Sequence, residues 1–214
     1  MHVNEANGFG DLLNIDLTGP HPDSRQGCVY ILTAMDAYTR FLIAVPLRNK
    51  TAEIVATALV NSAFIPYGCW LRLNSDQGGE FTNAVLLHVT RLLNIHKIRT
   101  TAYRSQSNGR YERIHRTIND LMAKVVSENQ RDWQDRLPMI VVAYNAAHHD
   151  TTGHSPFYLV FGRENRIPLD LVLTTSVTER VEDRHEYADQ LRERMQDAYK
   201  LANKRLKTTT ERMK

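Results

Sequence analysis

Three carboxylates stand at positions from which a fold could bring them together. Asp16 lies inside the strand-like run LLNIDL, Asp76 follows an apolar strand and precedes a Gly-Gly turn, and Glu112 lies in a basic, helix-like segment. Between Asp76 and Glu112 there are 35 residues. Carboxylates grouped beside arginines are what two magnesium ions and a phosphodiester require. The residue types therefore indicate a nucleotidyl-transfer site.

Spacing alone does not establish this site, because acidic residues are common along the chain. Asp and Glu make up 24 of the 214 residues, so two acids at this separation carry little information by themselves. The context of Asp16 is more informative, since a charged side chain inside an apolar strand is costly unless it is paired or bound to a metal. Solvated surface acids are the alternative, and metal binding is the interpretation we favour.

Basic side chains gather around Glu112, the one acid among them. The arginines of this region are Arg99, Arg104, Arg110, Arg113 and Arg116. They could form an ordinary solvated face, but their position beside the proposed site favours contacts with phosphates. Asn108, Glu112 and Arg116 share one helix face. With Gln106, the candidate nucleic-acid contacts are Arg104, Gln106, Asn108, Arg110, Arg113 and Arg116.

Hydrophobic periodicity predicts the elements that must position these residues. The expected strands cover 12–17, 28–35, 40–47, 69–75 and 95–102, and the expected helices begin near residues 51, 81, 105 and 133. The second and third strands form a hairpin, in which Asp36 is most simply a turn residue. Pro138 could bend or break the last of these helices. The order indicates an α/β fold with a mixed five-stranded sheet flanked by helices.

The composition predicts one sizeable buried core with an appendage. Hydrophobic residues make up 42% of the chain, no run of 18 apolar residues occurs, and MHVNEANGFG lacks the parts of a signal peptide. We expect a soluble chain without a secretion signal. Cys28 and Cys69 lie in apolar runs and are expected to be buried thiols, and the histidines lack zinc-ligand spacing. The net charge of +3 does not by itself establish a nucleic-acid partner.

The composition changes after about Val177 to a highly charged, helix-like segment. Its narrow apolar stripe consists of Tyr187, Leu191, Met195, Ala198 and Ala202, and six basic residues against one acid occupy positions 200–214. A lone helix of this kind is marginal in water, so its order should depend on a partner. A solvated linker and a helix that binds DNA or a second subunit are both consistent with this pattern.

Several motifs in a fixed order now carry a resemblance to a known family. They are IDLTGP, LTAMDAYTRF, NSDQGGEF, SQSNGRYERIHRTI and the tail motif YNAAHHDTTGHSPFYLVFG at residues 144–162. The chain resembles the catalytic core of retroviral-type integrases, most closely those of gypsy-type LTR retrotransposons. It differs in having Tyr103-Arg104 where the family commonly has His-Pro, and the family's flanking zinc and C-terminal modules are not found in this sequence.

The resemblance implies a ribonuclease-H-like fold and a catalytic, metal-binding triad of Asp16, Asp76 and Glu112. It also implies two Mg²⁺ ions, with Mn²⁺ as substitute, and a polynucleotidyl transferase with endonuclease-type activity that acts on element and target DNA. The implied assembly is a homo-oligomer that works in the nucleus and reaches it in a particle. The expected organisation is an N-terminal extension (1–11), a catalytic core (12–170), and a linker with a charged helix (171–214).

Two other classes of function remain open at this point. A catalytically silent, domesticated or truncated relative would bind nucleic acid or protein without reacting. A ribonuclease H is the weaker rival, because the tail motif and SQSNG resemble integrases. The intact triad favours the transferase.

Overall fold

The computed structural model describes residues 6–75, 84–99, 131–166 and 184–212. The chain divides into two compact units, Met1–Tyr144 and Asn145–Lys214. The predicted helix around Glu112 lies outside the described residues.

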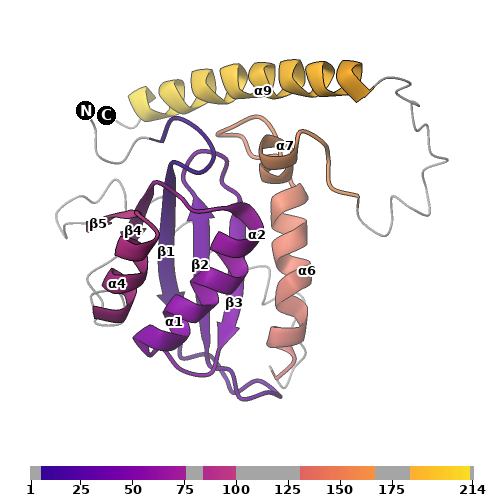
Figure 1. Ribbon diagram of the computed structural model, residues 1–214. Coiled ribbons are helices and arrows are strands. Elements are labelled where there is room, and N and C mark those ends of the chain that lie inside the picture. The colour runs from indigo at the N-terminus through magenta and orange to yellow at the C-terminus, as the bar shows by residue number, and fades with distance from the viewer. Residues whose placement is uncertain (1–5, 76–83, 100–130, 167–183, 213–214) are drawn as a thin grey trace. The chain divides into compact units, whose positions relative to one another are not determined.

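A five-stranded mixed sheet forms the centre of the first unit, and its order is β3-β2-β1-β4-β5 (Figure 1). The strands are β1 (Leu12–Thr18), β2 (Tyr30–Asp36), β3 (Leu42–Leu47), β4 (Arg72–Ser75) and β5 (His96–Arg99). β1, β2 and β3 pair antiparallel, whereas β4 and β5 run parallel to β1. The predicted α/β class, the hairpin start and the mixed five-stranded sheet are confirmed.

The two faces of the sheet bury different side chains because successive residues of a strand point to opposite sides. Ile31 and Met35 of β2 and Leu42 of β3 share one face, where they meet α6 (Trp133–Ala146). Trp133, Leu137, Ile140 and Tyr144 of α6 complete this cluster. Cys28 joins it as the buried thiol that was predicted. α6 continues through Pro138 without a break in the helix.

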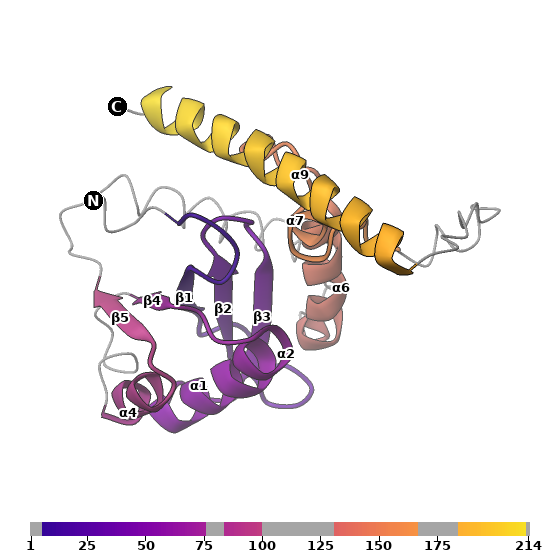
Figure 2. The ribbon, with the colours of Figure 1, turned by 45° about the horizontal axis from the view of Figure 1, so that its top comes forward.

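The opposite face is covered by helices from the middle of the chain, α1 (Ala52–Leu59) and α4 (Ala84–Leu92) (Figure 2). Thr51 occupies the N-cap position as expected, but its side chain makes no capping hydrogen bond. α1 runs on through a π-helical turn, η1 (Val60–Phe64), into the short α2 (Ile65–Tyr67). Gly68, with φ of 86°, ends this helical stretch as predicted.

Two expectations for the segment before β4 need correction. β4 begins at Arg72, not at residue 69, and Cys69 is exposed rather than buried. Trp70 is buried at 2% exposure, as predicted, and its indole Nε1 donates to Asp36 Oδ2 over 2.8 Å. Both residues precede the strand, and of the two only the larger Trp70 side chain enters the core.

The second unit contains α7 (Pro156–Phe161) and the long α9 (Arg184–Arg212). Ser155 caps α7 by accepting from the backbone N–H of Tyr158, and Gly162 ends it in the left-handed conformation. The described part of the expected α9 stripe packs within this unit, where Ala198 and Ala202 are buried. The partner that a lone helix needs is therefore supplied by the tail motif. None of the helices in the described ranges is long and apolar enough to span a membrane.

Candidate active site

Asp16 lies in the fifth position of β1 and is partly exposed, although the first four residues of that strand are buried. Its Cα partner on β2 is Thr33, so both side chains lie on the sheet face that α6 covers elsewhere. Asp16 Oδ1 accepts the backbone N–H of Leu17 at 2.8 Å, and Thr33 Oγ1 donates to the Asp16 carbonyl over 3.2 Å. These bonds fix the backbone around the carboxylate.

A buried amide pair lies two residues before Asp16. Asn14 of β1 is the register partner of Asn74 of β4, and Asn74 Nδ2 donates to Asn14 Oδ1 over 3.0 Å. Both side chains are 5% exposed. Asn14 Nδ2 is buried without a hydrogen-bond partner among the described residues. A buried amide N–H that lacks an acceptor is costly, so Asn14 Nδ2 can donate to an oxygen atom of a ligand bound beside Asp16.

The amide pair was not predicted, although the sequence holds a signal for it. Asn-x-Asp occurs at 14–16 and again at 74–76. The parallel register of β1 and β4 joins residues that are 60 positions apart, and it aligns the two asparagines. Only this register, and not either sequence run alone, identifies the pair.

The other predicted site residues lie outside the described residues. They are Asp76, Glu112, Arg104, Gln106, Asn108, Arg110, Arg113 and Arg116. The backbone of Arg99 forms the end of β5, opposite Ser75 of β4. Within the described ranges, no group of three His, Cys, Asp or Glu side chains could hold a metal ion. Of the triad, the structure therefore places Asp16.

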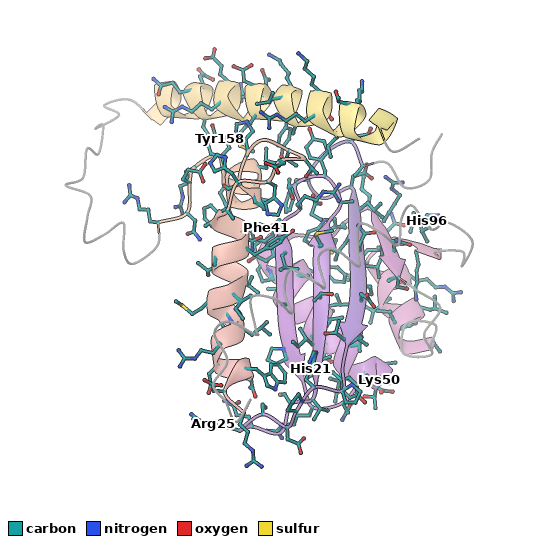
Figure 3. The ribbon with its side chains drawn as sticks, turned by 180° about the vertical axis from the view of Figure 1, so that it is seen from behind. His21, Arg25, Phe41, Lys50, His96 and Tyr158 are labelled. Atoms are coloured by element: carbon teal, nitrogen blue, oxygen red, sulfur yellow. The ribbon has the colours of Figure 1, made fainter. Side chains whose placement is uncertain are left out.

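His21 is a second polar group near the end of β1 that the sequence did not single out. Its side chain is labelled in Figure 3. Its Nε2 lies 3.0 Å from Thr18 Oγ1, and its ring lies 5.6 Å from the ring of Trp133, centroid to centroid. Trp133 Nε1 donates to the Pro22 carbonyl over 2.8 Å. Burial lowers the pKa of His21, which favours its neutral form. These contacts tie the segment after Asp16 to the start of α6.

Asp36 forms the turn between β2 and β3, as predicted, but it is also fully buried. Its Oδ1 accepts from the backbone of Tyr38 and from both the backbone and hydroxyl of Thr39. Its Oδ2 accepts from Gly10 N–H and from the Trp70 indole. Asp36 is therefore a structural carboxylate, and it lies opposite Leu13 at the end of β1 away from Asp16.

Strand order, register and helices on both faces define an α/β domain of the ribonuclease-H type. Residues 7–105 match the family described as Integrase core domain. The structure is similar to the crystal structure of the catalytic core domain of BIV integrase, with a TM-score of 0.57 and 25% sequence identity. The similar region covers 72% of this chain and 95% of that one.

The relatives in sequence agree with this assignment. The chain is 31% identical over 204 residues to the Retrovirus-related Pol polyprotein from transposon 412 of Drosophila melanogaster, covering 95% of this chain. It is 27% identical over 168 residues to Gypsy retrotransposon integrase-like protein 1 of Pongo abelii, covering 78% of this chain. It spans only 16% and 32% of the lengths of these two proteins. Residues 7–105 thus match an integrase core domain, and the chain is similar in sequence to a retrotransposon Pol polyprotein and to gypsy integrase-like proteins.

Proposed function

We propose that this chain is the catalytic part of a metal-dependent polynucleotidyl transferase that inserts element DNA into target DNA. The two reactions would be trimming of the element's 3′ ends, with water as the attacking group, and strand transfer, with a DNA 3′-hydroxyl. We further propose that it works in the nucleus as a homo-oligomer bound to both DNAs. The integrase core domain supports the integration class.

The observation that carries the proposal is the alignment of the two Asn-x-Asp runs. β1 and β4 are parallel neighbours, Asn14 is paired with Asn74, and Asp76 is the first residue after Ser75 at the end of β4. If the same register continued for two residues, Asp76 would stand beside Asp16. Ligand sites of open α/β sheets lie beyond the carboxyl ends of such strands. We propose that Glu112 joins these two acids.

The donor set at this position suits magnesium. Mg²⁺ prefers oxygen ligands, keeps several waters and is commonly held by one or two carboxylates with substrate phosphates. Asp16 supplies a carboxylate that accepts from Leu17 N–H, and Thr33 of β2 bonds its carbonyl. On the same face of β1, Asn14 Nδ2 is buried without a hydrogen-bond partner among the described residues. We propose that Asp16, Asp76 and Glu112 would together hold two such ions.

When bound, such a pair of ions would activate the attacking oxygen and stabilise the leaving oxygen of the phosphodiester. The residues of this chain would hold and orient the reacting groups. Leu17 N–H restrains the Asp16 carboxylate directly, and the Thr33 hydroxyl restrains the Asp16 backbone through its carbonyl. The Asn14–Asn74 pair fixes the register between β1 and β4. We propose that Arg104, Gln106, Asn108, Arg110, Arg113 and Arg116 contact the DNA, with the arginines binding phosphates.

Asp16→Asn tests the proposal most directly. The amide keeps an oxygen that can accept from Leu17 and has nearly the same volume, but it lacks the charge that holds a divalent cation. With a branched DNA substrate and Mg²⁺ or Mn²⁺, we expect a loss of strand cleavage of roughly 10³-fold or more. Asp76→Asn and Glu112→Gln should behave alike. Asp23→Asn, an exposed acid on the loop after β1, is the matched control and should keep full activity.

The same assay separates the proposal from a silent binding module. A wild-type protein that binds the substrate but does not cleave it in either metal would support the silent module. Cleavage that survives in Asp16→Asn would show that the triad assignment is wrong. DNA affinity and thermal unfolding are measured beside the cleavage, and they show whether each variant is folded and binds its substrate.

A further inference from the structure

The tail motif at residues 144–162 forms a docking site for α9. Gly162, at φ of 68°, lies directly under Leu191 and Met195, and a Cβ at this position would meet Met195 Sδ at 3.0 Å. Tyr199 donates its hydroxyl to the Leu159 carbonyl over 3.1 Å. Because only glycine allows both this backbone angle and this close approach, the end of α7 is shaped to receive α9.

A second contact fixes the rotation of α9 one to two turns further along. The Arg205 guanidinium covers Gly153, where a Cβ would meet Arg205 Cζ at 2.6 Å, and Arg205 Nη1 lies 3.5 Å from the Asp150 carbonyl oxygen. Ala198 and Ala202 are buried on the same side, at 3% and 0% exposure. Small side chains there let α9 approach closely. The docked face of the helix is therefore defined over several turns.

Docking this face turns a basic face of α9 to the solvent. Lys200, Lys204 and Lys207 are exposed and recur at i, i+4 and i+7, about half a turn of the helix away from Ala198 and Ala202. We call these three residues the lysine ladder. It spans about 10 Å of the helix axis at 1.5 Å per residue. No acidic residue occurs between Asp197 and Glu211.

The helix dipole does not account for the ladder. Cations stabilise a helix C-terminus only within about the last turn, and α9 continues to Arg212. The exposed face of the preceding turns differs, since Asp189, Glu193 and Asp197 alternate there with basic residues. Arg192 lies 3.6 Å from Asp189, and Lys200 lies 2.9 Å from Asp197, which marks the boundary between the mixed and the basic part. The mixed and the basic parts thus occupy successive turns of one helix.

We infer that the lysine ladder is a binding surface for the phosphate backbone of double-stranded DNA, held in place by the docking of α9 on the tail motif. A duplex carries one negative charge per about 1.7 Å of its axis, so a straight row of cations is complementary to it without reading bases. Docking orders the helix beforehand, so little ordering is left to be done on binding. This inference rests on the proposed DNA function and adds a contact surface apart from the carboxylate site.

The test compares two double variants of α9 that remove equal charge. Lys204→Gln/Lys207→Gln shortens the ladder, and Arg192→Gln/Arg194→Gln removes two exposed arginines from the mixed part. Affinity for fluorescent duplexes of two unrelated sequences is measured over a salt series. We expect the ladder variant to reduce the slope of log K against log salt by roughly two for both sequences, at about 0.9 per phosphate contact. The control should change it by less than half as much.

Three results would overturn the inference: an unchanged slope in the ladder variant, an equal change in the control, or a loss for one sequence alone. A change in oligomeric state with an unchanged slope would show that the ladder meets protein instead of DNA. Circular dichroism checks that both variants keep α9. The salt slope is separable from catalysis, because Asp16→Asn should lose cleavage while keeping the full salt slope.

Discussion

The carboxylate of Asp36 joins three segments of the first unit. It accepts hydrogen bonds from the turn after β2, from Gly10 near the start of β1 and from Trp70 just before β4. The sequence indicated a turn acid, because Asp commonly bonds the backbone two or three residues on. It could not indicate the bonds from Gly10 and Trp70, because these depend on strands that are brought together only in the folded sheet.

Asp36→Ala should therefore be severely destabilising. It leaves five N–H and O–H donors without their acceptor, each of which costs about 1–3 kcal/mol when buried, and we expect a total loss on the order of 5 kcal/mol or more in the free energy of unfolding. Urea denaturation followed by tryptophan fluorescence measures it, since Trp70 is one of the donors. Asp23→Ala, at an exposed acid, should stay within about 0.5 kcal/mol. A similar small change for Asp36→Ala would show that the network contributes little.

At the site, the sequence predicts the strand position of Asp16 but not the buried amide pair beside it. A charged residue in an apolar run predicted a strand position with a special role, and the structure places it on β1 with partial exposure. The sequence does not indicate the amide pair of Asn14 and Asn74, because neither residue is unusual in its own run. The two residues meet because β1 and β4 pair in one register across 60 residues of sequence, and local patterns do not contain that register.

At the scale of elements, periodicity predicted the strands well because each faces a buried layer. The hairpin of β2 and β3 and the end of the α1-η1-α2 stretch at Gly68 follow from local patterns. The π-helical turn and the late start of β4 do not, since both depend on how Phe64 and Trp70 fit the core. Tertiary packing decides such boundaries.

The packing of α6 makes one element-scale prediction about pH. Burial raises the pKa of Tyr144 from 10.0 to about 12, although the charge of Arg40 acts in the opposite direction. The folded protein therefore keeps the phenol proton above pH 10 while the unfolded chain releases it, so stability falls as the pH rises through this window. Between about pH 9 and about pH 11, the wild type should lose roughly 1 kcal/mol more than Tyr144→Phe.

Urea denaturation at the two pH values measures this difference, and the Phe variant serves as the control for all other alkaline titrations. The ring of Phe fills the same position in the cluster with Trp133 and Leu137. Equal pH dependence in the two proteins would mean that Tyr144 titrates as an exposed phenol does, contrary to its burial at the end of α6.

At the scale of the whole molecule, the expected linker helix needs a different description. Its apolar stripe is narrow, as the sequence indicated, but it is sufficient because its receptor is the small α7 and the loop before it. The tail motif supplies the glycines and the carbonyl groups that receive the helix. A sequence pattern reveals an amphipathic face, whereas the surface that covers it must be found in the fold.

Deleting residues from Val177 onward tests how the two units share stability. The core of the first unit consists of the sheet, α1 and α6, and its clusters use residues up to Tyr144. The deletion removes α9 and leaves Leu159 and the tail motif without Tyr199, Leu191 and Met195. We expect the hydrogen exchange of the β1 and β2 amides, which reports the stability of the first unit, to remain nearly unchanged. Amides of α7 should exchange faster, and DNA affinity should fall.

Gly162→Ala in the full chain provides the matched case, since it disturbs the docking of α9 without removing it. A large loss of protection in β1 and β2 upon deletion would mean that α9 belongs to the cooperative core, and that the chain unfolds as one unit.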